Sequence, residues 1–206
     1  MTLKTLPASA RPDADLSPTK RRVMHVAATL FAEKGYGSVG ISEVGDAAEL
    51  GKGALYYHIR SKEDLLYDIM TLYMVDLVSG ADGILSVATG AVERVRALSS
   101  ALIEAVFQTR AEMTVCFREV HSLGDEKRAD VLKLHGDYQR IWTKVLSEGV
   151  EEGVFRPLSR VEIKGLLGMY FYAFLWVRPS GKETPEEVSD AFAGIVLKAA
   201  MRTDAA

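Results

Sequence analysis

A short basic and aromatic segment contains the residue types that would contact nucleic acid. Residues 51–58 read Gly-Lys-Gly-Ala-Leu-Tyr-Tyr-His, and Lys62 follows shortly after. Small residues let a backbone approach DNA closely, lysine reaches phosphate or guanine, and tyrosine and histidine donate hydrogen bonds to phosphate oxygens. Lys62 stands in the first turn of a predicted helix, where free N–H groups and the helix dipole already favour an anion. The segment therefore indicates a surface that binds DNA.

A second group of cations stands where the helical pattern of the chain begins. Lys20, Arg21 and Arg22 crowd the N-terminal turn of a predicted helix, where the dipole disfavours cations, and this suggests an external anion as partner. Residues 1–62 carry nine Lys or Arg against six Asp or Glu, and the remainder carries 16 against 22. This asymmetry fits an anion-binding head on an acidic body, although random variation in surface charge would also produce it.

Residues for catalysis or metal binding do not come together in the sequence. It has no nucleophile–base pair and no phosphate loop, and neither His121 nor His135 has a carboxylate at metal-ligand spacing. Cys116 is the single cysteine, which excludes disulfide scaffolds and zinc ribbons. The longest stretch without a formal charge, residues 165–177, would make about 20 Å of helix, too short to cross a bilayer. We therefore expect a cytoplasmic protein that is not an enzyme, needs no metal or cofactor, and has no membrane partner.

Helical periodicity governs most of the chain. Apolar residues recur at spacings of three and four, and no window alternates as a strand does. Two short helices are predicted over residues 41–48 and 52–58, each too short to be stable without tertiary contacts, and Ser61 caps a long helix after them. Capping boxes at residues 159–162 and 184–187 begin the last two helices. These features predict an all-α chain of about nine helices.

Two short helices joined by a tight turn and held between longer ones form a helix-turn-helix motif. The first short helix braces against the DNA backbone, and the second presents its N-terminal residues to base edges in the major groove. Leu55 and Tyr56 have a competing interpretation, because either could instead be a core residue that fixes the three helices. The spacing of the elements and the residues of the second short helix therefore agree on DNA recognition.

Residues 19–66 resemble the DNA-binding domain of TetR-type transcriptional repressors. The matching residues are Phe31-Ala32, Lys34-Gly35-Tyr36, Ala47-Ala48, Lys52-Gly53, Leu55-Tyr56, His58 and Ser61-Lys62-Glu63-Asp64-Leu65. Residues 1–18 are polar and spaced by prolines, which predicts a flexible tail. The resemblance implies an N-terminal three-helix helix-turn-helix domain at 19–66 and a ligand-binding and dimerisation domain at 67–206. It implies a homodimer that binds a palindromic operator in double-stranded DNA. The expected DNA contacts are Lys20, Arg21, Arg22, Ser42, Lys52, Gly53, Ala54, Tyr56, Tyr57, His58 and Lys62.

Three residues of the helix-turn-helix depart from the family pattern. Gly40 stands where the family often has a hydroxyl N-cap, and Gly45 replaces the usual helical alanine. Glu49 takes the place of the turn glycine, where a positive φ would cost a non-glycine residue about 1 kcal/mol or more. We expect a looser domain than most, in which Glu49 sharpens sequence choice by repelling DNA phosphates.

Residues 135–200 are similar to the C-terminal half of TetR-type regulators of steroid and fatty-acid catabolism. The matching positions are Gly149, Glu152-Gly153, Phe155-Arg156, Trp176, Arg178-Pro179 and Gly181. Some of those regulators bind coenzyme A thioesters, so the resemblance implies a small hydrophobic effector, with an acyl- or steroid-CoA thioester as one candidate. The alternative is a DNA-binding regulator or architectural protein without a small-molecule inducer.

The apolar residues of the C-terminal region favour a hydrophobic pocket. Between Glu162 and Arg178 the only cation is Lys164, so the phosphates of a coenzyme A group would need other cations. The candidates are Arg94, Arg96, Arg110, Arg118 and Arg140. The expected pocket residues are Phe107, Met113, Phe117, Trp142, Leu167, Tyr170, Phe171 and Phe174, although the aromatic residues could equally form ordinary core or a dimer interface. Small residues on the last two helices predict that these helices form a close-packed dimer interface.

Overall fold

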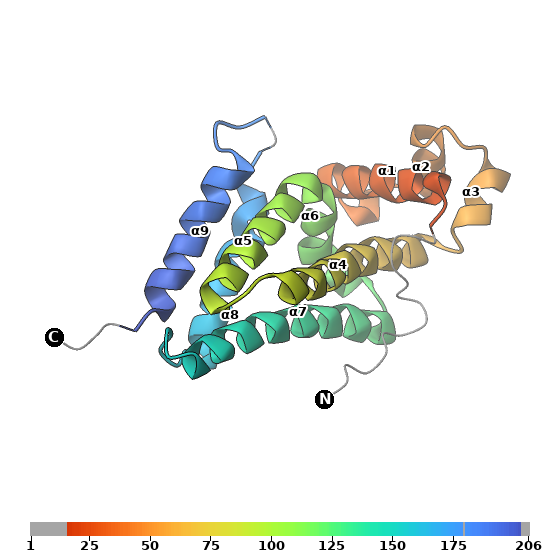
Figure 1. Cartoon of the computed structure of the whole chain (residues 1–206). Coiled ribbons are helices and arrows are strands. Elements are labelled where there is room, and N and C mark those ends of the chain that lie inside the picture. The colour runs from red at the N-terminus through yellow and green to blue at the C-terminus, as the bar shows by residue number, and fades with distance from the viewer. Residues whose placement is uncertain (1–15, 179, 203–206) are drawn as a thin grey trace. The chain divides into compact units, whose positions relative to one another are not determined.

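The computed structural model describes residues 16–178 and 180–202, and within these ranges it is helical without a β-strand. An isolated antiparallel bridge joins Phe155 to Met201. The α-helices are α1 (Pro18–Lys34), α2 (Ile41–Ala47), α3 (Lys52–His58), α4 (Lys62–Val87), α5 (Ala91–Gln108), α6 (Arg110–Glu119), α7 (Asp125–Glu151), α8 (Arg160–Phe171) and α9 (Pro185–Ala200), and the 3-10 helices are η2 (Tyr36–Ser38), η3 (Val120–Ser122) and η4 (Tyr172–Leu175) (Figure 1). The predicted all-α fold is confirmed, whereas most of the predicted flexible tail, residues 1–15, lies outside the described residues.

The helices form two compact units. Unit 1 comprises the described residues up to Asp76 together with Ala111–Leu134, and unit 2 comprises Leu77–Arg110 together with the described residues from His135 onward. The boundary falls inside α4 and inside α7, so each of these helices contributes residues to both units. Unit 1 therefore holds the three N-terminal helices and also α6 from Ala111 onward, while the domain bounds at 19–66 and 67–206 stay a prediction.

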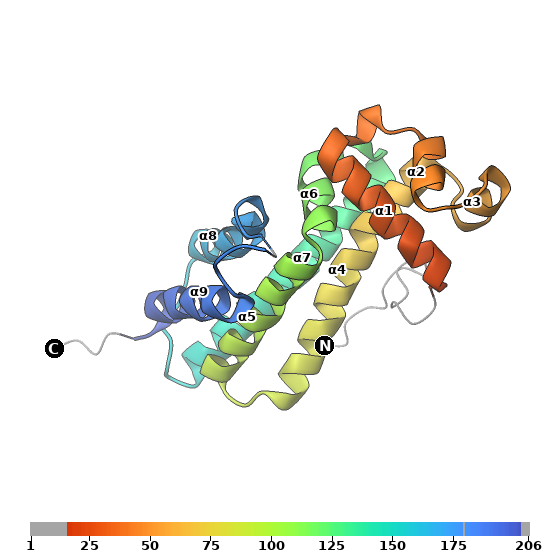
Figure 2. The same ribbon diagram turned by 90° about the horizontal axis from the view of Figure 1, so that it is seen from above.

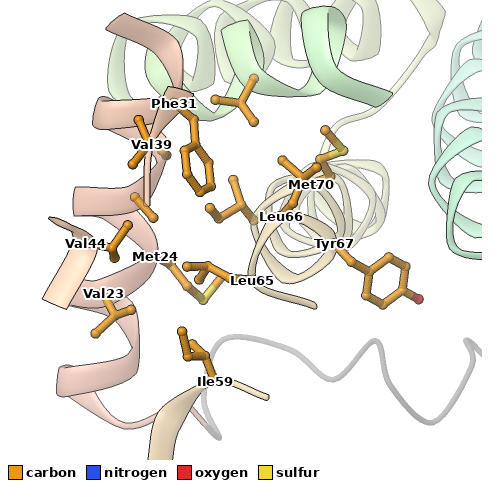
Figure 3. Close-up of a cluster of buried hydrophobic side chains, with 14 of the residues drawn as sticks. Val23, Met24, Phe31, Val39, Val44, Ile59, Leu65, Leu66, Tyr67 and Met70 are labelled. Carbon is orange, nitrogen blue, oxygen red and sulfur yellow. The ribbon is translucent and has the colours of Figure 1, made fainter. Parts of the chain in front are cut away.

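The core of unit 1 is built around the first turns of α4. Phe31 from α1 points toward Leu66 from α4, and Val39, Val44 and Ile59 lie around them (Figure 3). All five side chains are buried. Because α2 and α3 have seven residues each, too few for a stable isolated helix, this shared core is what holds them in place.

The helix ends follow the chemistry of their terminal residues. Gly35, at φ +84°, ends α1 after Lys34, and Gly40 begins α2 without a side-chain hydrogen bond to the helix. Both predicted capping boxes are present, with Ser159 and Thr184 as the N-caps of α8 and α9. Local residue chemistry therefore sets where these helices begin and end.

Unit 2 packs α9 along α5, with α8 beside them (Figures 1 and 2). Its tightest approach involves Gly149 near the end of α7, where an added Cβ would lie 2.0 Å from Cδ2 of Phe155 and 2.8 Å from Cβ of Ala91. Beside it, the Glu152 carboxylate accepts a hydrogen bond of 2.9 Å from the Ala91 N–H, and Arg94 donates to Glu148. Glycine at position 149 is thus required by the close approach of α5, α7 and the segment that follows α7.

Helix α4 has the length and composition of a membrane-spanning helix. Its most apolar 18-residue window has a mean hydropathy of 1.3, and 44% of that window is buried within the protein. A core helix of a protein in water meets the same criteria, and Leu65, Leu66 and Met70 of α4 are fully buried in unit 1. Core packing therefore accounts for part of the apolar character of α4.

Candidate DNA-binding surface and effector-binding core

The side chains of α3 divide between core and solvent. Leu55, 1% exposed, is the only residue of α3 that is buried. The exposed residues of the helix are Lys52, Gly53, Ala54, Tyr56 and Tyr57, with Tyr56 45% and Tyr57 86% exposed. The core role considered for Leu55 and Tyr56 therefore holds for Leu55, while Tyr56 stays on the solvent side with the other predicted contacts.

Two of the departures from the family pattern, Gly45 and Glu49, lie near the end of α2. Gly45 is buried, and a Cβ there would lie 3.1 Å from Cδ2 of Leu55 and 3.2 Å from the carbonyl oxygen of Leu50. Glycine at this position thus lets Leu55 sit close against α2, which offsets its cost inside a helix. Glu49 adopts φ +56°, as predicted, in a region that costs a non-glycine residue about 1 kcal/mol or more.

Two of the predicted phosphate-binding lysines already have partners within unit 1. The Lys20 Nζ lies 2.7 Å from Oδ2 of Asp68. The Lys62 Nζ lies 4.2 Å from the centre of the Tyr36 ring, within the range of a cation–π interaction. A DNA phosphate would have to share or replace these partners. Of the remaining predicted contacts, Arg21, Arg22 and Ser42 are exposed, and His58 is half-buried with its ring edge-on to Tyr57.

The first turn of α4 is fixed by a hydrogen-bonded network. The Ser61 Oγ accepts a hydrogen bond of 2.9 Å from the Asp64 N–H, which caps the helix. Lys127 of α7 donates to Oδ1 of Asp64 at 2.7 Å, and hydrogen bonds from Lys127 and Ser61 hold the pKa of the Asp64 carboxyl below its usual value. Because Lys62 belongs to this turn, the network also positions a predicted DNA contact.

In unit 2, aromatic rings from three helices form one buried cluster. The ring centres of Trp142 and Tyr170 lie 5.3 Å apart, and Tyr170 meets Phe192 of α9 at 5.1 Å. The Tyr170 hydroxyl lies 2.6 Å from Oγ of the buried Ser99, and burial raises the pKa of Tyr170 to about 12. Tyr138, whose pKa is also raised by burial, lies 6.0 Å from the ring of Phe171.

His135 extends this cluster without adding a charge. Its ring centre lies 5.8 Å from that of Phe171, and burial lowers the pKa of His135 to about 4. The imidazole is therefore neutral at physiological pH. A cluster of uncharged rings with a few hydroxyl and imidazole groups suits an apolar ligand that carries few polar atoms.

The structure groups six of the eight predicted pocket residues in unit 2. Trp142, Leu167, Tyr170 and Phe174 are buried there, and Phe107 and Phe171 are half-buried. Met113 and Phe117 lie on α6 in unit 1, where Met113 is fully buried. The sequence prediction missed Tyr138, His135 and Phe192. Helical spacing from Trp142 identifies Tyr138, four residues earlier, but Phe192 joins the cluster only through the packing of α9.

Two protein-family models match this chain. A family model described as "Tetracyclin repressor-like, C-terminal domain" matches residues 88–200, more than half of the chain. The chain belongs to the TetR family. The model "Bacterial regulatory proteins, tetR family" matches residues 23–69 of this TetR-family regulator, which contain α2 and α3.

This TetR-family regulator aligns with individual relatives over nearly their whole length. It is 29% identical over 191 residues to the transcriptional repressor KstR2 of Mycolicibacterium smegmatis, covering 90% of this chain and 93% of the relative. It is similar to the solved structure of PfmR from Thermus thermophilus, with a TM-score of 0.80, 31% identity, and coverage of 88% and 100%. It is also similar to AibR, solved in complex with isovaleryl coenzyme A and operator DNA, with a TM-score of 0.75, 27% identity, and coverage of 86% and 97%. The chain is therefore a DNA-binding transcriptional regulator and, as predicted, not an enzyme.

Proposed function

We propose that this TetR-family regulator is a repressor that binds a palindromic operator as a homodimer and is released by a small, largely apolar effector bound in unit 2. The observation that carries the proposal is the division of α3, in which Leu55 alone is buried and the basic and aromatic residues face solvent. A helix held by one core residue can enter the major groove with the rest of its surface free for DNA.

DNA recognition uses α3 and the helix ends around it. Lys52, in the first turn of α3, reaches guanine or phosphate, and Tyr57 donates its hydroxyl proton to a phosphate oxygen. Lys62 and Lys20 add contacts with DNA phosphates, which position the domain but do not distinguish one base sequence from another. Binding to the operator places the regulator in the cytoplasm, with the DNA.

Dimerisation uses the apolar residues that unit 2 leaves exposed. The large exposed apolar side chains of α8, η4, the residue after η4, and α9 are Val161, Tyr172, Leu175, Trp176 and Ile195. Trp176 is 49% and Ile195 46% exposed, and a second copy would remove both from water. Two copies present two α3 helices to half-sites about 34–36 Å apart, which is one turn of DNA.

The effector binds the aromatic cluster of unit 2. Its neutral rings favour an acyl or steroid group, and the relative AibR has been solved with isovaleryl coenzyme A and operator DNA together. We propose an acyl- or steroid-CoA thioester as the effector. A ligand that prefers a shape of unit 2 incompatible with operator binding weakens that binding through a coupling free energy of about 1–3 kcal/mol.

The experiment measures operator affinity at fixed salt with free acids and with their thioesters. The proposal expects at least one thioester to weaken binding by about 5- to 150-fold, the range of typical coupling energies. Tyr170→Phe, which removes the hydroxyl that contacts Ser99, should change the response to the thioester. Ser100→Ala, which removes the hydroxyl of an exposed serine of α5 beside Ser99, should not change this response and is the control. If neither acids nor thioesters change the operator affinity, the proposed effector is wrong, and the alternative of a regulator without an inducer is favoured.

A further inference from the structure

A groove of about 650 Å³ on unit 2 gathers four cations. It lies between the start of α5, the last turns of α9 and the chain segments that follow α7 and α9. Arg96, Arg156, Lys198 and Arg202 line it, together with the apolar side chains of Val92 and Leu197. No Asp or Glu is among the described residues that line the groove. The groove is thus basic, with an apolar part, and has no internal carboxylate to neutralise it.

Three of the four cations are available for a ligand. Arg156 is engaged within the chain, because it donates to Oε1 of Glu162 at 2.7 Å, and this contact together with Ser159 lowers the pKa of Glu162 to about 2. Arg96 and Lys198 are exposed, and within the described part of the chain the structure shows no hydrogen bond or ion pair of their side chains. The same holds for the side chain of Arg202.

The other arginines of unit 2 that the sequence offers for phosphate binding have partners elsewhere. Arg94 is paired with Glu148 and Arg140 with Asp137, while Arg110 donates to the carbonyl oxygen of Phe174 at 2.9 Å. Such pairs would have to open before these arginines met a phosphate. Arg96, two residues after Arg94, is the member of this group that combines an unpaired guanidinium with a groove.

We propose that this groove binds the phosphate groups of a small amphipathic molecule, whose uncharged part lies on Val92 and Leu197. A diphosphate or several phosphate groups carry enough negative charge to face three cations at once, and the planar guanidinium of Arg96 can bind two phosphate oxygens together. A single carboxylate would leave most of the positive charge of the groove unpaired. The proposal rests on the proposed effector only for the identity of the group that the phosphates carry.

The groove and the aromatic cluster share α5. Arg96 precedes Ser99 by three residues, about 4.5 Å along the helix axis; Arg96 is exposed at the groove, whereas Ser99 is buried. The Ser99 hydroxyl contacts that of Tyr170 in the cluster. One molecule with phosphates at one end and an apolar group at the other therefore matches the order of these residues along α5.

The experiment titrates the full-length protein with adenosine 3′,5′-bisphosphate and with coenzyme A by isothermal calorimetry. Each probe should bind, and binding should weaken as salt rises because the cations are exposed. Arg96→Ala and Lys198→Ala should each raise the Kd about threefold to fivefold, and the double variant about tenfold or more, as for exposed charge pairs. Lys164→Ala is the matched control, because Lys164 is an exposed cation of α8 that does not line the groove. The melting temperatures of all variants should match the original, since these side chains are exposed.

Several results would overturn the proposal: no binding of either probe, an equal loss of affinity in Lys164→Ala, or binding only to vesicles of anionic lipid. Free acids provide the comparison with the effector proposal. If acids or thioesters weaken operator binding while Arg96→Ala and Lys198→Ala leave the affinity for every phosphate probe unchanged, the groove proposal is wrong and the effector proposal stands. If phosphate binding depends on Arg96 and Lys198 but no thioester changes the operator affinity, the groove proposal is supported and the effector proposal is wrong.

Discussion

The two units differ in how they present their functional chemistry. In unit 1, α3 keeps only Leu55 in the core and exposes its basic and aromatic residues within one seven-residue segment. In unit 2, the aromatic cluster draws Trp142 from α7, Tyr170 from α8 and Phe192 from α9, and buries Trp142 and Tyr170. The comparison teaches that the proposed DNA-binding surface is local in sequence, whereas the proposed effector-binding core is assembled from distant segments.

The largest expected effect comes from removing the single anchor of α3. Leu55→Ala deletes a buried leucine side chain and should lower the free energy of unfolding by about 2–5 kcal/mol, because its cavity lies between α2 and α3. Operator binding should be lost at temperatures where unit 2 still binds its ligand, as measured by anisotropy and calorimetry on the same sample. Tyr57→Ala is the control, since it should weaken DNA binding without changing the melting temperature. A Leu55→Ala variant that binds DNA normally would show that α3 does not depend on this anchor.

Acidification should destabilise the protein through His135 of unit 2. The folded protein keeps His135 neutral down to about pH 4, whereas the unfolded chain protonates it near pH 6.5. Between these values the unfolded state binds more protons, so stability falls as the pH drops from 6.5 to 4, by up to about 3 kcal/mol. Urea unfolding at each pH measures the slope, and His135→Gln should flatten it. The exposed His121→Gln should leave the slope unchanged, and the same slope in both variants would remove His135 as its cause.

A smaller effect is expected from the proposed contact between Lys62 of unit 1 and a DNA phosphate. Lys62→Ala should weaken binding to all DNA sequences alike and lower the magnitude of the salt slope by about one unit, because one phosphate contact is lost. Fluorescence anisotropy over a salt series, with specific and random duplexes, measures both quantities. Lys133→Ala, an exposed lysine of the same unit, should retain the original slope. An unchanged slope in Lys62→Ala would mean that Lys62 serves only its contact with Tyr36.

The smallest effect concerns the turn before α3. Glu49→Gly keeps the positive-φ conformation and removes its steric cost, so it should raise the free energy of unfolding by up to about 1 kcal/mol. Removing the carboxylate should also raise DNA affinity and relax sequence choice. Glu49→Gln separates the two causes, because it removes the charge and keeps the backbone cost. Equal stability of the glycine and glutamine variants would exclude backbone strain.

The helices of unit 1 could be predicted well because their ends are set by local chemistry. Gly35 ends α1 and residues 52–58 form α3, as the pattern predicts, and the positive φ of Glu49 follows from its place in the turn. The need for Gly45 could not be predicted, because it arises from the approach of Leu55 across the turn. The sequence alone shows that a glycine destabilises the helix at this position, but it does not show that the glycine makes room for Leu55.

The candidate site in unit 2 was only partly predictable. Trp142 and Tyr170 follow from helical apolar stripes, which do not reveal that Tyr170 bonds to Ser99 on another helix. The groove was missed as a site because Arg96 and Lys198 stand about a hundred positions apart and meet only when α9 packs on α5. Which arginines remain unpaired depends on tertiary ion pairs such as Arg94 with Glu148, and no spacing rule provides that information.

Selection of bound duplexes from a random DNA library by the full-length protein tests the central claim most directly. The account predicts an enriched inverted repeat whose half-sites lie one helical turn, about 34–36 Å, apart. It also predicts that Lys52→Ala changes the enriched bases within each half-site, because Lys52 begins the exposed surface of α3. Enrichment of no sequence, or the same inverted repeat with unchanged base preferences in Lys52→Ala and Tyr57→Ala alike, would contradict α3 as the DNA-reading element.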